Sequence, residues 1–93
     1  MDDINEWHKF KQKYPIGIEV EGKIIKKMPF GVFVDIGEKF LTLLEIIEMV
    51  GLNYDHYQSN QQFNVGDRVK GTVGGFTDNN KQMRITQKKR KRT

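Results

Sequence analysis

The strongest constraint on the fold is an alternation of apolar and polar residues in two separate segments. In residues 19–24, Val20, Gly22 and Ile24 alternate with charged side chains, and in residues 68–73 valine and glycine again alternate with polar side chains. Successive side chains of a β-strand point to opposite faces, so this pattern is typical of a strand with one buried and one solvated face. Both segments are therefore predicted to be strands that cover a core on one side only.

The apolar composition favours strands over helices in the rest of the chain. There are nine isoleucines and seven valines, but only four leucines and no alanine. β-Branched residues suit a pleated surface, whereas alanine and leucine are the best helix formers. A chain of 93 residues supports one small core, so we predict a single all-β domain.

The order of the predicted elements narrows the fold further. A helix at residues 3–14 ends before Pro15, because the residue before a proline is displaced from helical geometry. The remaining predicted elements are strands at 17–27, 30–36, 40–44, 68–73 and 82–86, a helical turn at 45–50 and a polar loop at 52–62. Five strands, with a long connection and a short helix between the third and the fourth, are the order of an OB-fold β-barrel.

Three aromatic residues lie outside the predicted strands. Trp7 belongs to the apolar stripe of the N-terminal helix, and we expect it to cover one mouth of the barrel. Tyr54 and Tyr57 lie in the long loop, where they either join a stacking surface for a ligand or pin the loop in place. The pattern alone does not choose between these two roles.

Positive charge is concentrated near the end of the sequence. The net charge is +4, and residues 88–92 carry five consecutive positive charges; outside them, eleven Lys and Arg stand against twelve Asp and Glu. A block of like charges repels itself and attracts polyanions such as nucleic acids. We therefore predict a helical extension at 1–15, a barrel domain at 16–87 and a disordered basic tail at 88–93. A solubilising end without a partner and a nuclear targeting signal are the alternatives for the tail.

Two phenylalanines stand out in the second predicted strand. Phe30 and Phe33 are three positions apart, whereas residues on one face of a strand are two or four apart. A bulge at Gly31 would bring the two rings to the same face, and with Val32 and Val34 directed inward that face is the outer one. Exposed ring pairs of this kind stack nucleic-acid bases, at about 1–3 kcal/mol for each base. The alternative is that the long loop or the N-terminal helix covers the rings.

Four strings of residues carry a family resemblance. They are Val20–Ile24, Pro29–Ile36, Phe63–Val69 and Met83–Thr86. With these strings, residues 17–88 resemble an S1 domain, the OB-fold RNA-binding module first named from the ribosomal protein. Together with the second-strand string, residues 13–17 are similar to small stand-alone bacterial members of that family. The resemblance implies an RNA-binding barrel, and the absence of cysteine fits a reducing cytoplasm.

In the S1 family the nucleic-acid face uses two aromatics of the second strand, a histidine of the third strand, an aspartate before the last hairpin and a basic residue that begins the fifth strand. The resemblance places these five positions on Phe30, Phe33, Leu43, Asp78 and Gln82. Leu43 and Gln82 depart from the family pattern, although Lys81 and Arg84 lie on either side of Gln82.

The sequence therefore favours a module that binds single-stranded RNA with little sequence preference, with single-stranded DNA as an alternative ligand. The expected phosphate contacts are Lys23, Lys70 and Arg84, and the tail residues Lys88, Lys89 and Arg90 are expected to add a diffuse attraction. No enzyme activity, cofactor, metal site or membrane contact is expected, because the chain has no cysteine, one serine, two distant histidines and no long apolar run.

A protein-interaction module is the alternative function. Leu43 in place of histidine, next to Phe30 and Phe33, would form an apolar patch suited to a protein partner or to association with the ribosome. The acidic residues that would favour a protein over RNA are Glu19, Glu21, Glu45 and Glu48.

Overall fold

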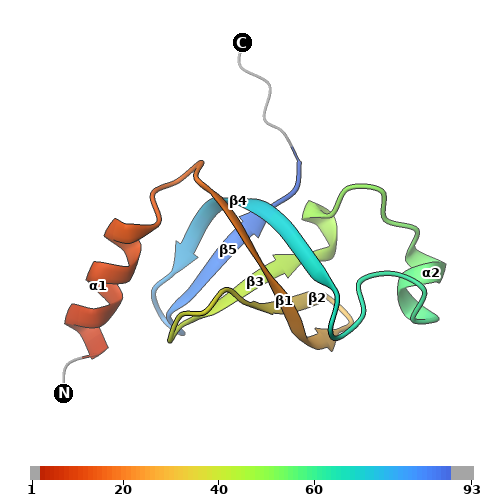
Figure 1. Ribbon diagram of the computed structural model, residues 1–93, viewed down its shortest axis with the longest axis horizontal. Coiled ribbons are helices and arrows are strands. Elements are labelled where there is room, and N and C mark those ends of the chain that lie inside the picture. The colour runs from red at the N-terminus through yellow and green to blue at the C-terminus, as the bar shows by residue number, and fades with distance from the viewer. Residues whose placement is uncertain (1–2, 89–93) are drawn as a thin grey trace, which may run out of the picture.

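The computed structural model (Figure 1) describes residues 3–88 of the chain. Its elements are α1 (Asp3–Lys13), β1 (Glu19–Met28), β2 (Gly31–Asp35), β3 (Leu41–Glu45), a 3-10 turn η1 (Ile46–Glu48), α2 (Tyr54–Gln58), β4 (Arg68–Thr77) and β5 (Gln82–Thr86). Lys89 and Arg90, which we predicted to contact nucleic acid, lie outside the described residues.

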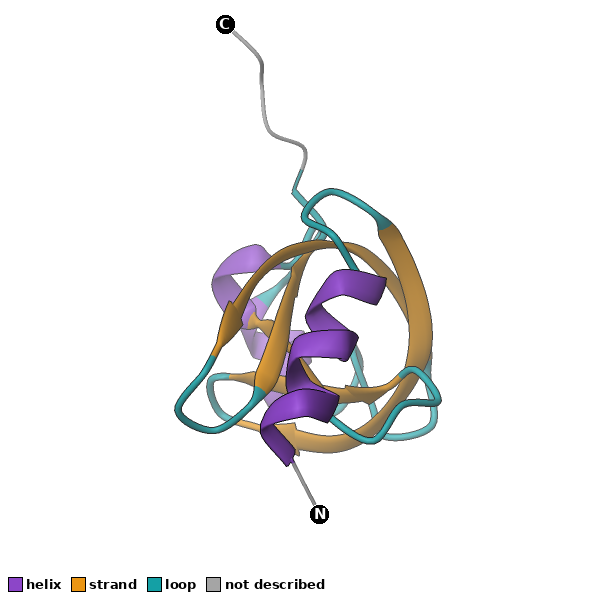
Figure 2. Ribbon diagram, turned by 90° about the vertical axis from the view of Figure 1, so that its left-hand side faces the viewer, coloured by secondary structure: helices purple, strands orange, loops and turns teal. Residues whose placement is uncertain are grey.

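The five strands form a closed barrel in the order β1-β2-β3-β5-β4. β3 and β5 are parallel, and the other neighbouring strands are antiparallel. Figure 2 shows the strands wrapping around the barrel, with α1 lying across one end of it. The predicted five-stranded OB-fold barrel with a short N-terminal helix is confirmed.

The core follows the alternation seen in the sequence. Val20, Gly22 and Ile24 of β1 are buried while the charged residues between them are exposed. Trp7 is 2% exposed and closes the end of the barrel, as predicted, with its ring packed on Phe10 of α1. Edge contacts from Trp7 reach Phe40 between β2 and β3 and Phe76 of β4, so the helix is joined to the barrel by aromatic packing.

The predicted bulge at Gly31 is wrong. Phe30 lies in the turn before β2, and β2 pairs with β3 in continuous register from Gly31 onward. A Cβ atom on Gly31 would lie 2.4 Å from the carbonyl oxygen of Leu44, so glycine is required there by the close approach of β3. The register irregularity lies instead in β1, between Ile24 and Lys26.

The long connection contains more structure than predicted. The predicted turn at 45–50 is the short 3-10 turn η1, but the predicted loop at 52–62 contains the helix α2. The side chain of Asn53 caps α2 by accepting a hydrogen bond from the backbone amide of His56 at 3.0 Å. A helix of five residues is too short to produce a periodic apolar pattern, which is why the sequence did not indicate it.

Candidate nucleic-acid interface

Phe30 and Phe33 lie side by side on the outside of the barrel. Their ring centroids are 6.3 Å apart, and the rings meet edge to face. Phe30 is 49% exposed, and Phe33 is half-buried between two buried valines that point into the core. The backbone carbonyl of Phe30 accepts a hydrogen bond from the amide of Ile46 at 2.9 Å, which ties the turn that carries Phe30 to the end of β3. About half of the Phe30 surface therefore stays open to solvent.

Leu43 forms the floor beside Phe33. It pairs with Phe33 of β2 on one side and with Arg84 of β5 on the other. Its neighbours Thr42 and Leu44 are fully buried, so the alternation of the strand directs Leu43 to the outer face. It is 8% exposed and does not belong to the core cluster. Leu43 therefore packs against the aromatic side chains of the outer face, and it has no aromatic ring on which a base could stack.

Arg84 completes this surface from β5. Its guanidinium lies above Gly75 of β4, where the absence of a side chain leaves room for it. The Nη1 atom is 3.9 Å from Oε1 of Glu45, and half of the Arg84 side chain is exposed. We call the outer surface made by Phe30, Phe33, Leu43, Glu45 and Arg84 the aromatic face.

Lys26 is a cation beside this face that the sequence prediction missed. It pairs directly with Phe33 across β1 and β2. In a regular strand Lys26 would point inward like Ile24, but the irregularity at Ile25 inserts one residue and turns Lys26 outward. Its side chain is exposed and has no hydrogen bond or ion pair within the described residues. The signal in the sequence was the pair of doublets, Ile-Ile followed by Lys-Lys at 24–27, where the alternation loses its phase.

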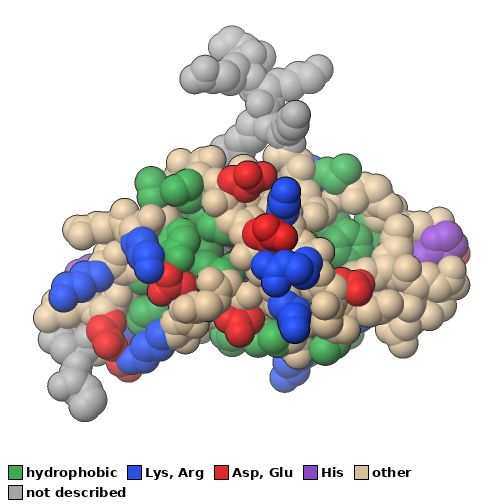
Figure 3. Space-filling view, viewed as in Figure 1, with side chains coloured by type: hydrophobic (Ala, Val, Ile, Leu, Met, Phe, Trp, Pro, Cys, Tyr) green, Lys and Arg blue, Asp and Glu red, His purple; other side chains and the backbone are tan. Residues whose placement is uncertain are grey.

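Lys23 and Lys70 belong to a different surface. Lys70 of β4 pairs with Glu21 of β1, and Glu21 forms an ion pair with Arg68 at 3.1 Å. Lys23 lies between Arg68 on one side and Asp35 on the other. Figure 3 shows positive and negative side chains interspersed over β1 and β4. Opposite charges at this spacing largely cancel, so this surface attracts a polyanion only weakly.

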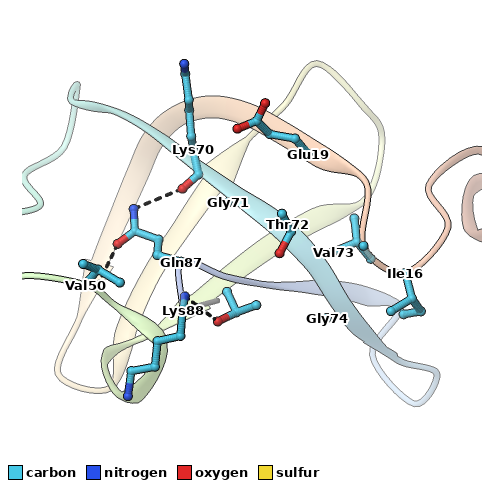
Figure 4. A pocket seen from close by; sticks show the side chains of 12 residues that line it. Ile16, Glu19, Val50, Lys70, Gly71, Thr72, Val73, Gly74, Gln87 and Lys88 are labelled. Atoms are coloured by element: carbon cyan, nitrogen blue, oxygen red, sulfur yellow. Dashed lines mark hydrogen bonds between the residues drawn. The ribbon is translucent and has the colours of Figure 1, made fainter. Parts of the chain in front are cut away.

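Lys70 and Lys88 line a separate groove on the barrel, with a volume of about 720 Å³. In Figure 4 the side chain of Gln87 lies between Val50 and Lys70 and joins their backbones by two hydrogen bonds of 3.0 Å. The strand β1 separates β4, which carries Lys70, from β2, which carries Phe33. Of the predicted cations, the structure thus brings Arg84 to the aromatic face and leaves Lys70 and Lys88 away from it.

Asp78 is held by the N-terminal helix. Its Oδ1 atom accepts hydrogen bonds from Trp7 Nε1 at 2.8 Å and from Lys11 Nζ at 2.9 Å. These two hydrogen bonds, that of Lys11 first, lower the pKa of Asp78 below its ordinary value. Asp78 lies in the turn between β4 and β5, at the end of the barrel that α1 covers, whereas Phe30 lies at the opposite end of β3 (Figure 1). Its carboxylate therefore fastens α1 and is not brought together with the phenylalanines.

Tyr57 holds the turn that presents Phe30. Its ring is buried, and its hydroxyl lies within hydrogen-bonding distance of the carbonyl oxygens of Met28 and Gly31, on either side of Phe30. Burial raises the pKa of Tyr57 above its ordinary value, and the neighbouring Tyr54 adds to this effect, so the hydroxyl stays protonated and donates. The two tyrosines thus differ: Tyr57 pins the loop, while Tyr54 is exposed.

Tyr57→Phe is expected to lower the free energy of unfolding by about 1–3 kcal/mol, because the buried carbonyl groups lose their donor. It should also loosen the turn that carries Phe30, although the hydrogen bond from Ile46 to the Phe30 carbonyl keeps part of this turn in place. Urea denaturation measures the first effect. Tyr54→Phe is the matched control, and equal stability losses in the two variants would contradict the assignment of Tyr57.

Within residues 3–88 the structure brings together no group of three or more His, Asp or Glu side chains that could hold a metal ion. No helix in the same range is long and apolar enough to cross a membrane.

The sequence of the barrel matches the S1 RNA binding domain over residues 13–88. The chain belongs to the S1 RNA-binding domain family. Its residues are 36% identical over 69 positions to the small ribosomal subunit protein bS1 of Chlamydia trachomatis, a match that covers 74% of this chain and 12% of that protein. The bS1 protein of Chlamydia muridarum matches equally. The family membership makes this S1 domain a nucleic-acid-binding module.

Solved structures share the fold of this S1 domain. GSP13 from Bacillus subtilis superposes with a TM-score of 0.64 at 22% identity, over 78% of this chain and 55% of that one. RNase R of Mycoplasma genitalium, in complex with ribose-methylated single-stranded RNA, superposes with a TM-score of 0.66 at 18% identity, over 91% of this chain and 14% of that one. At these identities the likeness concerns the fold alone.

Proposed function

We propose that this S1 domain binds single-stranded RNA on the aromatic face, with bases stacked on Phe30 and Phe33. The observation that carries the proposal is the adjacent, outward-facing pair of rings, of which Phe30 is half exposed and Phe33 partly exposed. Stacking tolerates any base, because every base has a π-face, so the site as a whole has little sequence preference. The proposed role is binding, without a catalytic step.

Two cations support this site electrostatically. Lys26 borders Phe33 on the side of β1, and Arg84 borders Leu43 on the side of β5. A strand of RNA whose bases stack on the rings would therefore run between two positive side chains that contact its phosphates. Lys23 lies further along β1 and supplies a weaker contact, since Asp35 stands opposite it.

The proposed organisation has a barrel domain at 16–87, an extension at 1–15 whose helix α1 packs on the barrel, and a basic tail at 88–93 that adds a sequence-independent attraction for phosphates. The ribosomal bS1 relatives support an RNA partner and a cytoplasmic setting in association with the ribosome. Because the chain spans only 12% of bS1, the ribosomal setting stays part of this proposal.

A protein partner is the second candidate for the same surface. It would require Leu43 to be the apolar centre of an interface, but Leu43 is almost fully covered by its neighbours and offers little area. The observations therefore favour RNA over a protein.

A titration of the isotope-labelled protein with a seven-nucleotide uridine RNA, followed by amide chemical shifts, tests the proposal. We expect the largest shifts at residues 30–33, 43–45 and 84, because these backbones carry the stacking rings and their neighbours. Shifts confined to α1 or to the groove of Lys70 and Lys88 would contradict it. If no chemical shift changes at millimolar RNA, a protein becomes the favoured partner of the aromatic face.

A further inference from the structure

Glu45 occupies a position on the aromatic face that the stacking model does not use. The strand alternation directs it outward with Leu43, since Leu44 between them is fully buried. It pairs with Gly31 of β2, so no side chain projects from β2 at the position opposite it. The next residue, Ile46, donates its amide to the carbonyl of Phe30. The carboxylate therefore stands next to the residue whose exposed ring is the better stacking platform.

The carboxylate of Glu45 has unused acceptor capacity. Within the described part of the chain it accepts no hydrogen bond, and its closest cation, Nη1 of Arg84, is 3.9 Å away. The nearby Glu48 is engaged otherwise, because it accepts a hydrogen bond from the hydroxyl of Thr86 at 2.6 Å. The side chain of Glu45 is 35% exposed, so a ligand on the face reaches it.

A carboxylate that accepts no hydrogen bond on an RNA-binding surface has a definite chemical consequence. It repels phosphate groups and accepts hydrogen bonds only, so it favours ligand groups that donate. Bases in single-stranded RNA are read on their Watson–Crick edges. Guanine presents the N1–H and the N2 amino group side by side, which matches the two oxygens of a carboxylate. Adenine and cytosine present one amino group, and uracil presents one N–H between two carbonyl oxygens that a carboxylate repels.

We propose that Glu45 reads the Watson–Crick edge of the base stacked on Phe30, so that this one position favours guanine and disfavours uracil. The inference rests on the proposed function and adds a base preference at one position of an otherwise tolerant site. Arg84 offsets the repulsion between Glu45 and the phosphates, because its guanidinium lies close to the carboxylate and remains half exposed.

The test uses fluorescently labelled heptanucleotides of uridine that carry guanosine, inosine or no replacement at the central position. A single guanosine cannot assemble quadruplexes, and inosine differs from guanosine only by the absence of the N2 amino group. We expect the wild-type protein to bind the guanosine RNA at least about fivefold more tightly than the uridine RNA, the lower end of the range for a bidentate base contact. The affinity for the inosine RNA should lie between the affinities for the guanosine and the uridine RNA.

Glu45→Gln should reduce the ratio of guanosine to uridine affinity to below about twofold, because the amide replaces one acceptor with a donor. Its affinity for the all-uridine RNA should rise, since the repulsion of phosphates is lost. Glu19→Gln is the matched control, because Glu19 is also exposed but lies on β1, where it lines the separate groove. This variant removes the same charge and should leave the ratio of guanosine to uridine affinity unchanged.

Each outcome decides between the two proposals. Equal wild-type affinity for the three RNAs would overturn the role of Glu45 and leave the stacking site standing, whereas no binding of any RNA would overturn both. A Glu45→Gln protein that melts like the wild type and keeps the guanosine preference would also overturn the role of Glu45. The comparison of guanosine with inosine needs no variant, so the inference stays testable if Glu45→Gln fails to fold.

Discussion

Phe30→Ala and Phe33→Ala are each expected to weaken binding of single-stranded RNA by about 1–3 kcal/mol, because each removes one stacking platform. The two variants should differ in stability. Phe30 is half exposed in a turn, so its loss changes the free energy of unfolding little, whereas Phe33 is more deeply packed and its loss costs more. Fluorescence anisotropy with a uridine heptanucleotide measures the affinity, and a thermal melt is recorded for each variant.

Val65→Ala is the matched control for this pair. Val65 is an exposed apolar residue in the turn before β4, outside the aromatic face, so its truncation should leave RNA affinity unchanged. If both phenylalanine variants melt as folded proteins and bind RNA like the wild type, the bases do not stack on these rings and the proposed site is wrong.

Trp7→Ala is expected to lower the free energy of unfolding by about 3–5 kcal/mol, the range for removing a buried large aromatic side chain. Trp7 is almost fully buried, packs against Phe10, Phe40 and Phe76, and donates a hydrogen bond to Asp78. Its removal opens the end of the barrel and leaves Lys11 as the remaining hydrogen-bond donor to Asp78. Urea denaturation followed by circular dichroism measures the effect, since the variant lacks the single tryptophan of the chain.

Ile4→Ala on the same helix is the control, because Ile4 is exposed and its loss should change stability by a few tenths of a kcal/mol. Trp7→Phe separates the two contributions, since it keeps most of the ring contacts and loses the hydrogen bond to Asp78. If Trp7→Ala unfolds at the same urea concentration as the wild type, then residues 1–15 are an appendage and not a part of the folded domain.

The sequence predicted the barrel well because period-two alternation depends on local geometry. Val20 and Ile24 point inward as their spacing requires, and Trp7 closes the barrel as its place on the helical stripe suggests. The bulge was assigned to the wrong strand because a glycine has two structural uses, and Gly31 serves the close approach of β3. The displaced phase at Ile25 shows in the sequence only as the doublets Ile-Ile and Lys-Lys at 24–27.

The candidate site was harder to predict, since alternation tells which residues face outward but not which strands are neighbours. Lys70 and Arg84 both face outward, yet only Arg84 lies beside Leu43, because β5 pairs in parallel with β3 while β4 lies two strands from β2. Asp78 was expected at the nucleic-acid face from the family resemblance, but Trp7 and Lys11 hold it at the covered end. Such partners come from distant parts of the chain, which spacing alone does not reveal.

The parallel pairing of β3 with β5 has a consequence for how the protein folds. Leu43 and Arg84 are about forty positions apart, so this pairing closes a long loop and carries a high entropic cost. The pairing of β1 with β4 closes a loop of similar length, whereas β1 with β2, β2 with β3 and β4 with β5 are consecutive strands that close much shorter loops. We therefore expect the seam between β3 and β5 to close late on the folding pathway. Arg84 comes close to Leu43 and Glu45 only when β5 pairs with β3. A folding intermediate that lacks this pairing therefore contains Phe30 and Phe33 without the positive charge of Arg84 beside them.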